Sequence, residues 1–370
     1  VLVTGSVADR FPRKIVALFA VGGELVSSVA LLLYALSGPT EVWPLFLVSF
    51  GYGIARAFQA PAMRAMPPMV SPDGALPRVY ALFSSTWTTA VIIGPALSGF
   101  LYAVEPWVAY LGSTTLILFG WLSLFRLRFV RQPVPPDPDE KMTLHNALEG
   151  LRFIRRTPIL LGAVSLDLFA VLFGGAIALL PVIAEERLGV GDVGYGWLRA
   201  APGIGAAAMA LWIATRPITR HVGSTLFAVV AIFGAGTVVL GITRDYVVAF
   251  AVLVIISAAD MVSVYIRGTL VPLVTPDEKR GRVLAMENVF IGASNELGAF
   301  ESGVAGQTLG TPVTVIGGGV GTLVCVGVWA VAFPALRKID RFDDLEFHEI
   351  RDTVPPVPQD DARPEPGSIG

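Results

Sequence analysis

The chain has 370 residues, of which 54% are hydrophobic and only 15% charged, and its 27 basic and 29 acidic residues nearly balance. An average soluble domain is about 25% charged, so these charges are too few to cover a water-facing surface. The balanced charge argues against a nucleic-acid-binding protein. A single Cys and three scattered His argue against a disulfide framework or a metal site. We therefore predict an all-α polytopic membrane protein that sits in a lipid bilayer and needs no cofactor.

Ten apolar segments are long enough to cross a bilayer, which takes about 20 residues. We predict helices at 15–36, 43–65, 79–102, 107–126, 159–183, 196–215, 222–242, 246–267, 283–306 and 312–333. The segment at 283–306 is the most doubtful by hydropathy, because it carries Glu287, Asn288, Asn295, Glu296 and Glu301.

Basic residues gather in alternate loops. One set of loops and the C-terminal tail holds 22 of the 27 Lys and Arg residues, whereas the opposite loops hold only Arg187 and Arg244. Basic loops stay in the cytoplasm, so we place the first set and the C-terminus on the cytoplasmic side of the cell membrane. The longest of these loops, 127–158, is Pro-rich at first and then predicts an amphipathic helix at the cytoplasmic interface, for which a linking role is the simplest interpretation. The tail at 335–370 is predicted to be disordered.

The chain repeats itself 204 residues further on. The sequence at 68–73 returns in similar form at 272–277, and that at 94–99 returns at 298–303. A repeat of this length predicts two six-helix bundles of similar fold and equal orientation. We therefore divide the chain into an N-terminal bundle (1–126), a central loop (127–158), a C-terminal bundle (159–334) and a tail (335–370). The first bundle shows only four full spans, so we expect one helix and most of a second to precede Val1.

The loop before the first span reads Gly5-Ser6-Val7-Ala8-Asp9-Arg10-Phe11-Pro12-Arg13-Lys14. It resembles the signature Gly-x-x-x-Asp-Arg-x-x-Arg-Lys of the major facilitator superfamily, which lies between that family's second and third helices. The repeat, the central loop and the helix count fit the same family. The resemblance implies a gating role for Gly5, Asp9, Arg10, Arg13 and Lys14, since in the family this loop latches the outward-open state; the alternative is that the charges only set topology. The second-half counterpart, 214–220, has Thr215 in place of the acid.

Two further stretches resemble signatures of the family's exporters. Gly94-Pro95-Ala96-Leu97-Ser98-Gly99 is similar to Gly-Pro-x-x-Gly-Gly, with Ser98 for one Gly, and Arg56-Ala57-Phe58-Gln59-Ala60 is similar to Arg-x-x-Gln-Gly. The stretches 165–181 and 196–205 are similar to the drug and siderophore branch, which includes enterobactin and macrolide exporters. These resemblances imply export. The alternative for Gly94, Pro95, Ser98 and Gly99 is ordinary close packing of small residues.

Ionisable residues inside spans are costly and mark candidate sites for proton coupling or for buried ion pairs. These residues are Glu24, Arg56, Asp167, Asp260, Glu296 and Glu301. Candidate residues for lining a substrate cavity are Gln59, Trp87, Phe169, Phe173, Phe290 and Asn295.

Together these features predict a secondary active transporter, acting as a monomer, that exports an amphipathic small molecule, drug-like or siderophore-like, in exchange for protons by alternating access. The chain lacks a Gly-x-x-x-x-Gly-Lys-Ser/Thr phosphate-binding loop, and no set of nucleophile and base suggests an enzyme. The alternatives are uptake of a nutrient or metabolite by the same fold, and a membrane sensor or lipid scramblase that transports nothing.

Overall fold

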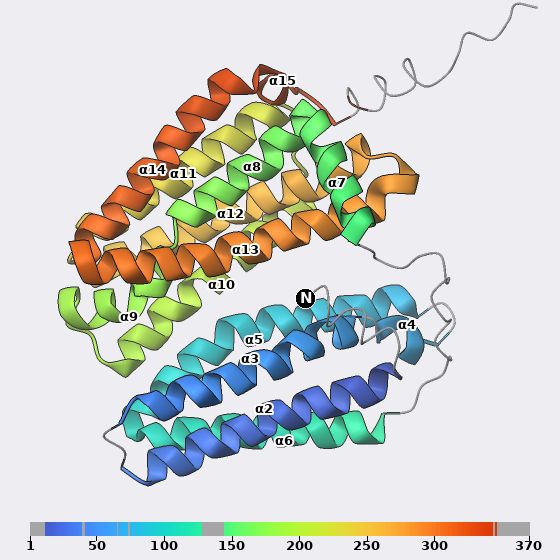
Figure 1. Ribbon diagram of the computed structural model, residues 1–370. Coiled ribbons are helices and arrows are strands. Elements are labelled where there is room, and N and C mark those ends of the chain that lie inside the picture. The colour runs from blue at the N-terminus through green and yellow to red at the C-terminus, as the bar shows by residue number, and fades with distance from the viewer. Residues whose placement is uncertain are drawn as a thin grey trace, which may run out of the picture.

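The computed structural model describes residues 12–38, 41–64, 66–72, 75–127, 144–342 and 345, and every regular element within them is helical. Figure 1 shows two bundles, the first coloured blue to cyan and the second green to red. The first contains α2 (Arg13–Leu36), α3 (Trp43–Arg64), α5 (Leu76–Val104) and α6 (Pro106–Arg126), with the short α4 (Pro67–Val70) between α3 and α5.

The second bundle has six membrane-length segments. The first of them starts as α8 (Pro158–Phe173) and continues through η1 (Ala176–Leu179), α9 (Leu180–Val182) and the π-helical η2 (Ile183–Arg187). The others are α10 (Asp192–Thr215), α11 (Val222–Ile242), α12 (Tyr246–Val274), α13 (Asp277–Leu309) and α14 (Thr311–Ala332), followed by the short α15 (Pro334–Arg337).

Each of the ten predicted spans corresponds to helix in the described part of the chain, one of them with an interruption, and eight segments there are both long and apolar enough to cross a membrane. The two that fall short are α3, which carries Arg56 and Gln59, and α13, which carries Glu287 and four more polar or acidic residues. Large apolar side chains cover the outer faces, such as Phe19 at 78% and Val331 at 79% exposed, as a lipid-facing surface requires. The protein is therefore an all-α, multi-pass membrane protein.

One predicted span is not a single helix. Residues 159–183 were expected to form one span, but α8 ends at Phe173 and the chain passes through Gly174 and Gly175 before it turns into 3₁₀ and π-helix. A Cβ atom at Gly174 would collide with the ring of Phe233 on α11, and one at Gly175 would lie 2.6 Å from the Gly298 carbonyl oxygen on α13. The two glycines thus let α11 and α13 approach the backbone where the helix is interrupted.

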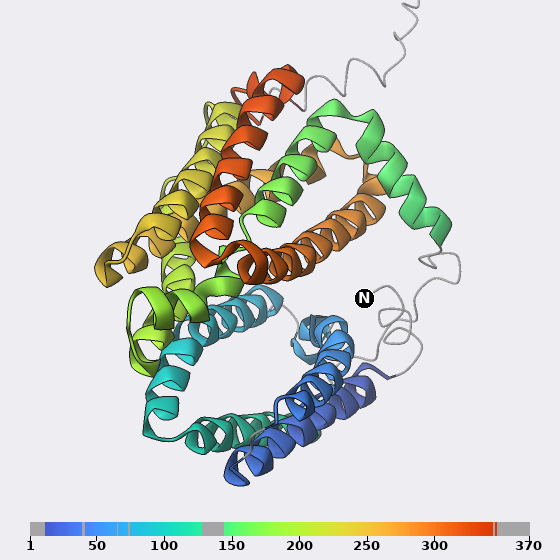
Figure 2. The ribbon, with the colours of Figure 1, turned by 60° about the vertical axis from the view of Figure 1, so that its left-hand side comes forward.

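The central helix α7 (Leu144–Arg156) packs on protein through the part whose side chains are described. Ile154 is 1% exposed and belongs to the core of the second bundle. Lys279 at the start of α13 lies 5.2 Å from the ring centre of Phe153, and Glu149 pairs with Arg282. Figures 1 and 2 show α7, in green, beside the first turns of α13. The helix is therefore attached to the second bundle and does not present this face to lipid.

Candidate functional site

A buried ion cluster joins three helices of the second bundle. Arg267, on α12, forms two ion pairs. Its Nη2 atom lies 2.7 Å from Oδ1 of Asp167 on α8, and its Nη1 atom lies 3.7 Å from Oε1 of Glu287 on α13. The three side chains are only 5%, 8% and 10% exposed. When both carboxyl groups are ionised, the charges of the cluster do not cancel, because one guanidinium faces two carboxylates. A buried net charge of this kind is expensive in a membrane, so the cluster is a candidate functional site.

A third carboxyl group lies next to this cluster. Asp260, two turns before Arg267 on α12, shares a cavity of about 10 Å³ with Asp167 and Ser263, and no hydrogen bond or ion pair joins Asp260 to a described residue. A cavity of this size holds about one water molecule. Arg267 Nε donates to Ser263 Oγ at 3.4 Å, and Ser263 lines the same cavity as Asp260. The structure thus brings together Asp167 and Asp260, two of the acids proposed from the sequence.

The first bundle holds a separate polar group. Glu24 on α2 is 4% exposed and accepts a hydrogen bond of 3.3 Å from Gln59 Nε2 on α3, while its Oε1 has no partner among the described residues. Arg56, one turn before Gln59, is exposed and donates to Tyr52 at 3.4 Å. Arg56 and Asp260, which occupy equivalent places in the repeat, therefore have different neighbours in different bundles.

Of the signature loop, Gly5, Asp9 and Arg10 lie outside the described residues, while Arg13 and Lys14 form the first turn of α2. Lys14 Nζ donates to the carbonyl oxygens of Phe125 and Leu127, at 2.9 and 2.7 Å. These carbonyls belong to the end of α6, where helical partners are missing and a positive charge is favourable. Lys14 therefore fastens the start of α2 to the end of α6.

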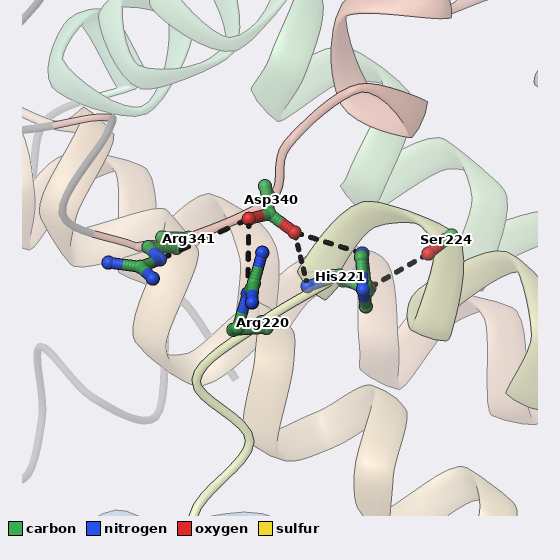
Figure 3. Close-up of polar contacts among 5 residues, drawn as sticks. All are labelled: Arg220, His221, Ser224, Asp340 and Arg341. Atoms are coloured by element: carbon green, nitrogen blue, oxygen red, sulfur yellow. Dashed lines mark hydrogen bonds and ion pairs between the residues drawn. The ribbon is translucent and has the colours of Figure 1, made fainter.

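The second bundle has a corresponding fastening, shown in Figure 3, between the loop before α11 and the segment after α15. Asp340 accepts a 2.9 Å hydrogen bond from the His221 backbone N–H, and its Oδ2 lies 3.5 Å from Arg220 Nε. That N–H, together with the neighbouring Arg220 and His221 side chains, lowers the pKa of the Asp340 carboxyl below its ordinary value. The backbone N–H of Gly223 also donates to the Ile339 carbonyl, at 2.9 Å.

The exporter-like stretch of α5 lies where the two bundles meet. Among the described residues, the bundles pack along α5 and α10 and hardly touch elsewhere. A Cβ atom at Gly99 would lie 2.8 Å from Gly196 Cα, and one at Gly196 would lie 2.8 Å from the Pro95 carbonyl oxygen. Only glycine allows this approach of two backbones. Gly94, Pro95, Ser98 and Gly99 also line a cavity of about 860 Å³, together with residues of α6, α9, η2 and α10.

The other proposed residues are spread over both bundles. Glu296, Glu301 and Asn295 are exposed on α13, and Trp87 on α5 is 58% exposed. Phe169 contacts Phe173 and Trp329, with ring centres 6.2 and 5.2 Å away, and Phe290 packs against the core of the second bundle. Neither of the two cavities described above is lined by these residues.

Sequence analysis did not identify Arg267, Glu287 or Asp340 as site residues. Arg267 lies at the end of a predicted apolar span, and Glu287 was noted only as a cause of low hydropathy. The sequence did contain a signal for this pair: a basic residue on one predicted span and an acidic residue on another. Charges inside a membrane usually pair.

Comparison with known proteins identifies the family. Residues 1–299 match the model of the Major Facilitator Superfamily. The chain belongs to this superfamily. It is 25% identical over 347 residues to the enterobactin exporter EntS of Escherichia coli, covering 91% of this chain and 80% of that protein, and 26% identical over 347 residues to EntS of Shigella boydii, with the same coverage.

Solved transporters share the fold. The peptide transporter POT matches with a TM-score of 0.67 at 14% identity, covering 92% of this chain and 84% of that chain. A bacterial homologue of the iron transporter ferroportin, in its inward-facing state, matches with a TM-score of 0.61 at 13% identity, covering 91% of this chain and 88% of that chain. As a member of the Major Facilitator Superfamily, the protein is a membrane transporter of small molecules and not an enzyme.

Proposed function

We propose that this superfamily member exports an amphipathic small molecule, drug-like or siderophore-like, across a bacterial inner membrane and takes up protons in exchange. The observation that carries the proposal is the buried group of Asp167, Asp260, Glu287 and Arg267. The three carboxyl groups of this cluster outnumber its single guanidinium. A carboxyl group that no positive charge balances can hold a proton inside the membrane. Export in particular is supported by similarity to the enterobactin exporters over 91% of the chain.

The packing of α5 on α10 supports alternating access. The contact involves Pro95 and Gly99 in the last part of α5 and Gly196 near the start of α10, so it lies at the end of the bundles far from the basic loops. With those loops in the cytoplasm, the bundles would be closed toward the outside and separate toward the inside. This corresponds to an inward-facing state, in which an exporter receives its substrate.

The test is transport into everted membrane vesicles from cells that produce the protein, with vesicles lacking it as control. We expect an imposed proton gradient, acidic inside, to drive accumulation of a catecholate siderophore or of an amphipathic drug, and a protonophore to abolish it. Accumulation in right-side-out vesicles instead would support the uptake alternative. Movement of labelled lipids between the two leaflets, together with no transport of any compound in the panel, would support the scramblase alternative.

A further inference from the structure

We propose that Arg267 is a movable counter-charge that links the proton on Asp167 to the position of α13, through exchange of its partner from Asp167 to Glu287. This inference rests on the proposed function, because it assigns the coupling of proton and transport to named atoms. Arg267 is a positioning residue here and has no assigned contact with substrate.

The two ion pairs of Arg267 differ in a way that suits such an exchange. The contact with Asp167 is a hydrogen-bonded ion pair of 2.7 Å, whereas the contact with Glu287, at 3.7 Å, is too long for a hydrogen bond. When Asp167 binds a proton, it loses the charge that holds the guanidinium. Glu287 is the carboxylate that already forms an ion pair with Arg267, and the 3.7 Å contact then shortens. Because Glu287 is on α13 and Arg267 on α12, the shortening moves the two helices relative to each other.

The proton has a defined route. The groups that face this site are Asp167 from α8, Asp260 and Ser263 from α12, and Glu287 from α13, while α11 contributes only Val229, Val230 and Phe233. Asp260 makes no hydrogen bond or ion pair with a described residue and shares the cavity of about 10 Å³ with Asp167, enough for about one water. A proton taken up on Asp260 passes through that water to Asp167. Asp260 returns to carboxylate, Asp167 becomes neutral, and Arg267 keeps its charge throughout.

The position of Glu287 on α13 makes the movement effective. Further along the same helix, Gly298 packs against α8 so closely that a Cβ atom there would lie 2.9 Å from the Val171 carbonyl oxygen. This backbone contact can serve as a pivot. Glu287 lies 11 residues before Gly298, which is about 16 Å along a helix. A small displacement at Glu287 therefore tilts α13 about the glycine contact, at the end that α7 also holds.

The first measurement separates proton-driven transport from exchange of substrate for substrate in everted vesicles, since exchange needs no net proton movement. Asp167→Asn, which imitates the protonated residue, and Glu287→Gln, which removes the second partner, should each lower proton-driven accumulation by about tenfold and keep exchange. Asn288→Ala, at the exposed neighbour of Glu287, is the matched control and should keep both. Normal proton-driven transport in Glu287→Gln would overturn the inference.

The second measurement does not depend on substrate. Spin labels at Pro158→Cys, the exposed first residue of α8, and at Gly281→Cys, near the start of α13, report the separation of these two helices in a protein whose buried Cys325 is replaced by Ser. We expect the distance distribution to change between mildly alkaline and mildly acidic pH, and to become independent of pH in Asp167→Asn and in Glu287→Gln. A pH response that persists in both variants would contradict the exchange of partners. Absence of any transport by the unmodified protein would instead count against the proposed function.

Discussion

Asp340 accepts a 2.9 Å hydrogen bond from the backbone N–H of His221, 119 residues earlier in the chain. The bond holds the segment after α15 across the start of α11, as Lys14 holds the start of α2 to the end of α6. The start of the third helix of each half, in the family's numbering, is thus bound to the end of the last helix or to the segment that follows it, by different chemistry. In the first bundle a lysine binds carbonyl groups, and in the second a carboxylate binds an N–H group and Arg220.

Replacing Asp340 by Asn should loosen this connection at neutral pH and have no effect in acid. The pKa of Asp340 is lowered in the folded protein, so its contribution is complete above the pKa of the unfolded chain and is lost as pH falls through the folded pKa. We expect faster amide exchange of the segment 216–223 in Asp340→Asn than in the unmodified protein at neutral pH, measured by mass spectrometry. Lys338→Gln, in the same segment, is the control. Equal exchange in Asp340→Asn and the unmodified protein would mean that the carboxylate adds nothing to the backbone contacts.

Replacing Gly99 by Ala should push the bundles apart along α5 and α10. The added methyl group meets the backbone of α10, which cannot move aside as a flexible side chain could. Overpacking of this kind costs about 1–3 kcal/mol, and we expect slower transport and a lower melting temperature. The repeat supplies the control: Gly303 occupies the equivalent place, and a Cβ atom there meets nothing within 4 Å. Equal losses of transport and of melting temperature in Gly99→Ala and Gly303→Ala would show that the close contact between α5 and α10 is not the cause.

Asp9 lies outside the described residues, and its role remains a prediction from the family signature. Asp9→Asn should strongly reduce transport and leave membrane insertion unchanged, because the basic residues that set topology stay in place. Transport in vesicles and the amount of protein in the membrane check the two parts separately. Normal export by this variant would leave Asp9 with a topological role alone.

Arg56 and Asp260 should not rescue one another. They lie in different bundles with different neighbours, Tyr52 near one and the Asp167 cavity near the other. Neutralising either should impair transport, and the charge-swapped protein with Arg56→Asp and Asp260→Arg should stay inactive. Recovery of transport in the swapped protein, where each single change fails, would demonstrate a direct ion pair in another state of the cycle.

Hydropathy and the internal repeat were sufficient to predict the ten helices, their order and the two bundles. Hydropathy alone leaves α13 doubtful. The repeat identifies it as a span, because 283–306 copies 79–102. The interruption of α8 at Gly174 was missed, since a run of apolar residues looks the same whether or not the helix is continuous. Its cause lies in neighbours from α11 and α13 that are distant in sequence.

The site was predicted in part. Asp167 and Asp260 stood out because a charge within an apolar segment is conspicuous, but their common cavity depends on how α8 and α12 are rotated about their axes. Arg267 and Glu287 could be paired only once the packing of α12 and α13 was known. Spacing along a single helix cannot supply that information, because side-chain partners on different helices are set by tertiary packing.

The attachment of α7 to α13 has a practical consequence for dividing this transporter into separately produced halves. Ile154 is buried in the core of the second bundle, and Glu149 and Phe153 contact the first turns of α13. A second half that started at Pro158 would leave the surface that Ile154 covers exposed to water. The chain should be divided before Leu144, so that α7 is produced together with the second bundle, to which it is bound.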